Sequence, residues 1–243
     1  MSKCPGFYFD IGKKARDLLH KDYGAQPPIH FHYQFLDWNL SLSCQIEQIV
    51  PGLSSLIKFD IPDSGKVELQ SLHDYAGITG CIGLIRNSSR GYDPVVSFSG
   101  VAGTTFLSLG GNLAFDIATK TFNKWNAGLT INTAFLIASL KLNDKFDTLK
   151  ASCYHAVNPV TRTAIAAELK HRFSTNEIVA TIGAQHALFP STLVKARVNT
   201  HGMAGALIQQ ELWQKVFITL AGEVDFRDMI KLPTVGLSLA LRL

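Results

Sequence analysis

The chain has 243 residues, of which 47% are hydrophobic and 17% are charged, and its formal net charge is +4. The basic residues are scattered, without the Lys and Arg clusters of a nucleic-acid-binding surface, so we expect no nucleic-acid partner. The four cysteines (Cys4, Cys44, Cys81 and Cys153) are far apart and lack CxxC spacing, which indicates neither a disulfide framework nor a zinc site.

Residues 1–23 predict a short amphipathic helix that begins near Pro5, a residue suited to a first helical turn. Its apolar residues recur at spacings of three and four and therefore share one face: Tyr8, Ile11, Ala15, Leu18 and Leu19. Between Tyr8 and Leu19, the charged residues outside this stripe are Asp10, Lys13, Lys14, Arg16 and Asp17. The segment lacks the apolar core of a secretory signal. It also contains acidic residues, which transit peptides avoid.

Residues 24–28 predict a linker. Gly24 supplies a hinge, and Pro27 and Pro28 exclude both a helix and a central strand. We therefore expect a pore helix over residues 1–23, a linker over 24–28 and a separate body over 29–243.

The body shows a period of two throughout. From Leu107 to Ile117, for example, apolar side chains alternate with polar or small ones, as in a strand with one apolar face. Turn residues recur about every 10 to 15 positions and no second helix intervenes, which indicates an antiparallel meander. Membrane strands of about 9–11 residues, each with a turn, would divide the body into about 16 strands.

Alternation alone fits both a soluble β-sandwich and a membrane β-barrel. The predicted polar face carries full charges among its Ser, Thr, Asn and Gly residues, as a water-filled bore requires. The longest uncharged run, residues 94–115, is too polar and glycine-rich for a spanning helix. We therefore predict an all-β protein, a transmembrane antiparallel β-barrel of about 16–17 strands with one N-terminal amphipathic helix.

Several stretches resemble plant mitochondrial porins, the voltage-dependent anion channels. Pro5-Gly6, the run from Asp10 to Leu19, and Asp22-Tyr23 are similar to the start of those proteins. A later block resembles the family signature; it comprises Gln185 to Leu188, Pro190, Val194 to Asn199, Ala206 to Gln209 and Gly222 to Asp225. Two departures are Phe189, where plant members usually have aspartate, and an interval of residues 24–50 that is about 30 residues short. Family barrels have nineteen strands, so this barrel is expected to be two or three strands shorter.

The resemblance implies a voltage-gated, anion-selective diffusion channel of the mitochondrial outer membrane, with a plastid outer membrane less expected. It would pass ions and small anionic metabolites such as ATP and ADP. Its partners would be the lipid bilayer and the permeating anions and nucleotides, and a homo-oligomer stays open. No catalytic constellation, cofactor or metal site is expected, so the protein is predicted not to be an enzyme.

The resemblance also assigns site residues. The gating residues expected on the helix are Asp10, Lys13, Lys14 and Arg16, with Gly24 as the hinge. Basic residues on predicted polar faces would line the pore and raise the local anion concentration: Lys66, Lys141, Lys170, Arg172, Lys195, Arg197 and Arg242. Other aromatic residues fit either interfacial girdles or ordinary strand positions: Trp38, Tyr75, Trp125, Tyr154 and Trp213.

Three alternatives remain at this point. A shortened porin isoform would have the same fold with little channel activity. The protein-import barrel of the same superfamily would share the fold, but that family lacks the N-terminal helix seen here. A soluble β-sandwich that serves as a binding module would bury its apolar face and stay in solution without detergent.

Overall fold

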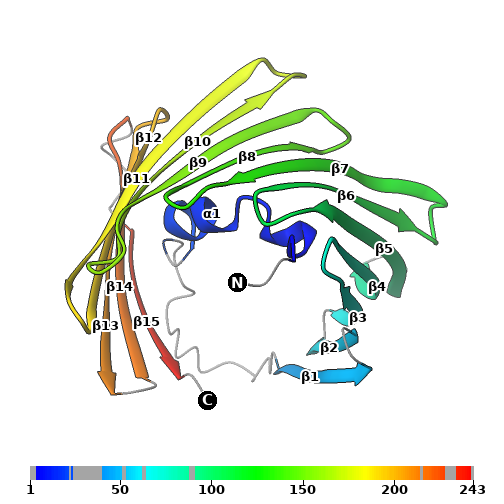
Figure 1. Ribbon diagram of the computed structural model, residues 1–243. Coiled ribbons are helices and arrows are strands. Elements are labelled where there is room, and N and C mark those ends of the chain that lie inside the picture. The colour runs from blue at the N-terminus through cyan, green and yellow to red at the C-terminus, as the bar shows by residue number, and fades with distance from the viewer. Residues whose placement is uncertain are drawn as a thin grey trace. The chain divides into compact units, whose positions relative to one another are not determined.

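The computed structural model describes residues 4–21, 23, 40–50, 53–61, 64–87, 91–213, 216–227 and 234–241 (Figure 1). The predicted hinge Gly24, the linker 24–28, and the predicted sites Arg242 and Trp38 lie outside the described residues. The chain divides into two compact units, which are treated separately below. Unit 1 comprises residues 1–11, 33–132 and 139–149, and unit 2 comprises residues 12–32, 133–138 and 150–243.

The described body consists of antiparallel strands that follow one another in chain order (Figure 1). The strands are β1 (Leu40–Val50), β2 (Leu53–Ile61), β3 (Ser64–Leu72), β4 (Ala76–Asn87), β5 (Gly91–Gly103), β6 (Leu107–Asp116), β7 (Thr121–Asn132), β8 (Leu136–Asn143), β9 (Thr148–Asn158), β10 (Thr163–Arg172), β11 (Glu177–Phe189), β12 (Thr192–Asn199), β13 (Met203–Trp213), β14 (Val216–Asp225) and β15 (Thr234–Leu241). This order confirms the predicted all-β meander. The prediction of 16–17 strands also counted residues 29–39 as part of the barrel, and these residues lie outside the described part.

The N-terminal helix is shorter than predicted and is interrupted. A 3₁₀ turn, η1 (Tyr8–Asp10), precedes a seven-residue α-helix, α1 (Lys13–Leu19). Gly12 separates them with φ of +64°, a left-handed conformation that glycine adopts without the steric cost of a Cβ atom. The prediction of one helix over residues 1–23 was therefore wrong in its extent. Within the described residues, no helix is both long and apolar enough to cross a membrane.

The apolar face of the strands is exposed and the polar face is buried, which is the reverse of the arrangement in a soluble protein. In unit 1, Leu109 of β6 is 61% exposed, whereas its neighbour Ser108 is 7% exposed. In unit 2, Ile182 of β11 is 55% exposed and Thr181 is 6% exposed. Soluble proteins bury large aliphatic side chains and leave most polar ones exposed. This arrangement contradicts the soluble β-sandwich alternative.

Three clusters of buried apolar residues form where the N-terminal residues pack against the polar face of the strands. In unit 1, Tyr8 and Ile11 pack against Val101 of β5. Unit 2 has two such clusters; one contains Ala15, Leu18, Leu19, Ala164 and Ala166, and the other contains Tyr23, Leu207 and Ala221. All five residues of the predicted apolar stripe are therefore buried, and they are buried against the polar face.

Candidate functional site

In unit 1, residues 4–11 occupy space that glycines leave on the polar face. A Cβ atom on Gly128 of β7 would lie 3.1 Å from Cδ1 of Ile11, and one on Gly110 of β6 would lie 3.2 Å from Cδ2 of Tyr8. Contacts of 3.0–3.4 Å are tighter than most carbon contacts, so a side chain at either position would press on the N-terminal residues. Lys141 adds a cation–π contact, with its Nζ 5.2 Å from the centre of the Tyr8 ring.

In unit 2, α1 and Tyr23 rest on equally small residues. A Cβ atom on Gly183 of β11 would lie 2.8 Å from Cδ2 of Leu19, and one on Gly205 of β13 would lie 3.0 Å from Cδ1 of Tyr23. Ala164 and Ala166 of β10 lie in the same cluster as Leu18 and Leu19. The polar face of unit 2 therefore has a shallow seat for α1.

Two basic residues of β12 hold the C-terminal end of α1. Nζ of Lys195 donates to the carbonyl oxygen of Asp17 at 3.2 Å, and Nη1 of Arg197 donates to that of Leu19 at 2.6 Å. The last carbonyls of a helix lack intrahelical partners and carry its negative dipole end. Lys195 and Arg197 therefore complement both the hydrogen-bonding capacity and the charge of this helix end.

Acidic residues on β10 and β14 lie next to the basic residues of β12 that contact α1. Arg197 forms an ion pair with Glu223, and its guanidinium lies 4.5 Å from the centre of the Tyr23 ring. His20, directly after α1, contacts Oε1 of Glu168 through Nε2 at 3.1 Å and Nη1 of Arg197 through Nδ1 at 3.2 Å. A neutral imidazole that donates from Nε2 and accepts at Nδ1 satisfies both contacts.

The other predicted site residues are dispersed. Asp10 accepts a hydrogen bond from the Phe7 N–H at 3.0 Å and so closes the η1 turn. Lys13 and Arg16 are exposed on α1, and Nζ of Lys14 lies 5.8 Å from the centre of the Tyr154 ring. On the strands, Lys66 pairs with Glu68, whereas Lys170 and Arg172 are half-buried on β10.

Sequence reasoning missed part of this site. His20, Glu223 and the glycines Gly128 and Gly183 were given no role, although both glycines share strand parity with polar residues. Tyr154 packs against the α1 cluster, so its interpretation as a girdle residue was wrong. Trp125 is 43% exposed and stacks edge-on with Phe122, which fits either of its two interpretations.

Tyr23 supports a pH prediction. The pKa of Tyr23 is raised to about 12, mainly by burial; the nearby Arg197 lowers the pKa and Glu223 raises it. Because the pKa is raised, the buried neutral side chain of Tyr23 makes its full contribution to the stability of the fold below about pH 10. This contribution is lost as the pH rises through about 12. We expect the difference in absorbance at 295 nm between the native protein and Tyr23→Phe to titrate near pH 12. A midpoint near pH 10 would show that Tyr23 is exposed to solvent.

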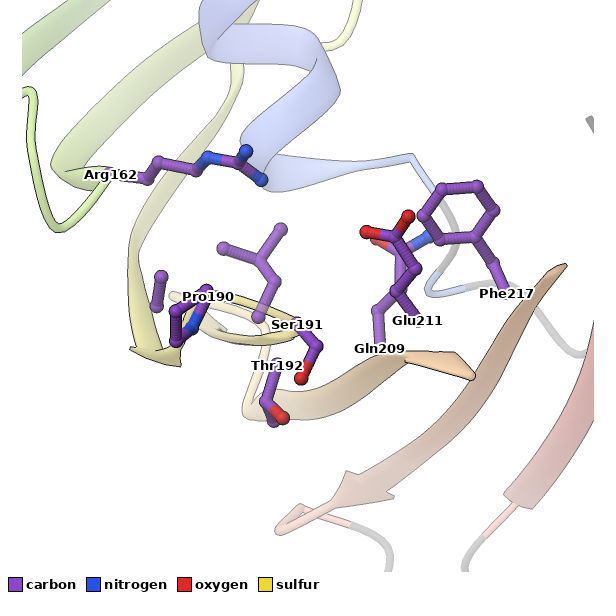
Figure 2. Close-up of a pocket in the computed structure, with 9 residues that line it drawn as sticks. Arg162, Pro190, Ser191, Thr192, Gln209, Glu211 and Phe217 are labelled. Atoms are coloured by element: carbon purple, nitrogen blue, oxygen red, sulfur yellow. The ribbon is translucent and has the colours of Figure 1, made fainter. Parts of the chain in front are cut away.

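A small cavity lies beside the β11–β12 turn in unit 2. Figure 2 shows Arg162, from the β9–β10 turn, and Glu211, from β13, extending toward the same space, with Pro190, Ser191 and Phe217 around it. Its volume of about 40 Å³ accommodates only a few water molecules. This cavity is therefore too small for a metabolite.

Comparison with known proteins gives concordant results. Residues 32–236 match the family described as "Eukaryotic porin". The chain is 44% identical to "Mitochondrial outer membrane protein porin of 36 kDa" from Solanum tuberosum and 39% identical to "Outer plastidial membrane protein porin" from Pisum sativum, with 100% of each chain covered. Both alignments span 281 positions against the 243 residues of this chain, which agrees with the predicted shortening.

A solved structure described as "Asymmetric conductivity of engineered proteins" is similar in fold. It aligns with a TM-score of 0.55 and 10% sequence identity, covering 83% of this chain and 86% of that chain. At this identity the similarity concerns the fold alone. Together with the full-length plant relatives, the family match confirms the resemblance to plant mitochondrial porins. The chain therefore belongs to the eukaryotic porin family.

Proposed function

We propose that this porin is a voltage-gated, anion-selective diffusion channel of the mitochondrial outer membrane that passes ions and small anionic metabolites such as ATP and ADP. One observation carries the proposal: in each unit the apolar face is exposed, while the polar face bears charged side chains and the N-terminal residues. A membrane barrel places apolar side chains against lipid and polar ones toward water.

In this proposal, residues 29–243 form the barrel wall, residues 24–28 the linker with Gly24 as hinge, and residues 1–23 the pore segment. The mitochondrial location rests on relatives such as "Mitochondrial outer membrane protein porin 1" from Arabidopsis thaliana, which is 41% identical. A plastid outer membrane is the second location, because relatives from pea and maize carry plastidial names. The protein-import alternative has no such support, since these relatives are named as porins.

Selectivity would arise from the basic groups of the polar face. These are Lys66, Lys141, Lys170, Arg172, Lys195 and Arg197, with Lys13, Lys14 and Arg16 of α1. Acidic partners offset some of this charge, as Glu68 does for Lys66 and Glu223 for Arg197. Moving one charge across the full membrane potential is worth about 2.3 kcal/mol per 100 mV. A few charges on α1 could therefore bias a gate.

Planar-bilayer recording of the refolded protein tests the channel. We expect stepwise conductance that falls at both voltage polarities and a reversal potential that favours chloride over potassium. Folded, β-rich protein that never produces steps would contradict the proposal and favour the shortened isoform with little channel activity.

A substitution on the apolar face tests its contact with lipid. Ile182 lies near the middle of β11, so Ile182→Arg should reduce the free energy of unfolding in lipid vesicles by about 2–4 kcal/mol, the cost of arginine near a bilayer midplane. Gln185→Arg, on the polar face of the same strand, should have a much smaller effect. Urea unfolding followed by tryptophan fluorescence measures both, and equal losses would contradict the assignment of the faces.

A further inference from the structure

A histidine on the apolar face of unit 2 has no part in the channel described above. His186 lies on β11, in the block that resembles the porin signature, and its side chain is exposed. Its alternation with Ile182 and Leu188, which are 55% and 58% exposed, places it on the apolar face. A polar group on a surface that meets lipid is costly unless it forms hydrogen bonds. The two ring nitrogens of His186 therefore need partners.

Two threonines supply partners on one side of the ring. Nδ1 of His186 and Oγ1 of Thr163 are 2.8 Å apart, and Oγ1 of Thr163 is 2.6 Å from Oγ1 of Thr161. Thr163 is the first residue of β10, so these hydrogen bonds connect the β9–β10 turn to β11. Within the part of the chain that the structure describes, Nε2 of His186 has no hydrogen-bond partner.

The surroundings of the ring determine which nitrogen carries its hydrogen. A neutral imidazole donates through one nitrogen and accepts through the other, and the hydroxyl of Thr163 can serve either role toward Nδ1. A phosphatidylcholine surface offers phosphate and ester oxygens as acceptors, whereas its headgroup has no N–H or O–H group. Nδ1 of His186 therefore accepts from Thr163, and Nε2 carries a hydrogen that faces the lipid.

The position of His186 along β11 suits a contact with a lipid headgroup. It lies four residues from Ile182, which is near the middle of the strand. In a strand tilted by about 40°, four residues cover about 10 Å of bilayer depth, and half of the apolar band is about 12 Å tall. An imidazole at this depth can extend to the headgroups, as other amphipathic side chains do. Ala184 and Ala196, paired in the next row toward the middle, leave shallow space for an acyl chain.

We propose that His186 binds one phospholipid on the apolar face of β10 and β11. Its Nε2–H donates to a phosphate oxygen of the headgroup, and an acyl chain of the same lipid lies over Ala184 and Ala196. Thr163 is a positioning residue, because it holds the ring through Nδ1. The inference rests on the assignment of the apolar face to lipid in the proposed function, but it does not depend on conductance.

Solid-state NMR of the full chain with ¹⁵N-labelled histidine in phosphatidylcholine bilayers measures this contact. A hydrogen bond to a phosphate oxygen places phosphorus about 3.5–4 Å from Nε2, close enough for ³¹P to dephase the ¹⁵N signal. The Nε2 signal that is missing from the spectrum of His186→Leu belongs to His186, and we expect it to be dephased. A His186 signal without dephasing would overturn the proposal.

Thr163→Val removes the hydroxyl at nearly constant size and should remove most of the dephasing at His186. Thr192→Val is the matched control, because the Thr192 hydroxyl donates to Gln210 instead, and it should leave the dephasing unchanged. Equal dephasing in the two variants would refute the positioning role of Thr163. In glycolipid bilayers supplied with inorganic phosphate we expect no dephasing, and dephasing there would show that the ligand is free phosphate rather than lipid.

Transfer of ¹H magnetisation from the acyl methylene groups to His186 separates this inference from the proposed function. Acyl contact together with dephasing supports both. Acyl contact without dephasing refutes only the headgroup site. The absence of both would contradict the assignment of the apolar face to lipid.

Discussion

Arg197→Gln should release the C-terminal end of α1 from β12. Arg197 donates to the carbonyl oxygen of Leu19, pairs with Glu223 and covers the ring of Tyr23, and glutamine can reproduce none of the charged contacts. A hydrogen bond to a charged group contributes about 1.5–3 kcal/mol, and 1.4 kcal/mol corresponds to a factor of ten in an equilibrium. The population with α1 detached should therefore rise about 10- to 100-fold.

Trypsin cleavage after Arg16 and Lys21 in detergent measures this population, because cleavage follows the open fraction when opening and closing are fast. Lys195→Gln should give a smaller increase, since its ammonium makes one hydrogen bond to the Asp17 carbonyl. Lys170→Gln removes a positive charge from β10 and is the matched control. If Arg197→Gln and Lys170→Gln are cleaved at the native rate, β12 does not anchor the helix.

Gly128→Val should displace residues 8–11 while preserving the strands. The atoms nearest to a Cβ at this position all belong to Ile11 and Tyr8, so valine competes directly with the N-terminal residues. Valine also favours a strand, which keeps β7 intact. Exposing Ile11 alone costs about 1.5–3 kcal/mol, which predicts about 10- to 100-fold faster chymotrypsin cleavage at residues 7–9.

Gly100→Val is the control for this experiment, because a Cβ atom on Gly100 of β5 would meet nothing within 4 Å. The double variant Gly128→Val with Ile11→Ala removes the main overlap and should partly restore protection relative to Gly128→Val. If Gly128→Val has the cleavage rate of Gly100→Val, the glycine is not needed for seating the N-terminal residues.

The sequence predicted the fold because its period-two pattern is long and regular. In the run from Leu107 to Ile117, for example, each large apolar residue lies on the same face, and β6 forms there. The helix was predicted less well. The stripe from Tyr8 to Leu19 gave the buried face correctly, but it could not show that Gly12 would adopt a left-handed conformation and divide the segment.

The candidate site depended on information that a linear pattern does not contain. Lys195 and Arg197 were placed on the polar face by alternation, whereas their contacts with the carbonyls of Asp17 and Leu19 join residues 178 positions apart. A seat glycine such as Gly183 could have been recognised only as a missing side chain on the polar face. Knowing which residue fills the space requires the structure.

The most direct test of the account asks which face of a strand is in water. Single cysteines are introduced on β10 of a cysteine-free protein in liposomes, at Leu169 on the apolar face and at Lys170 on the polar face. A water-soluble maleimide that does not cross lipid should label Lys170→Cys readily and leave Leu169→Cys unmodified. Preferential labelling of Leu169→Cys would contradict the account, because it would place the apolar face in water and the polar face away from it.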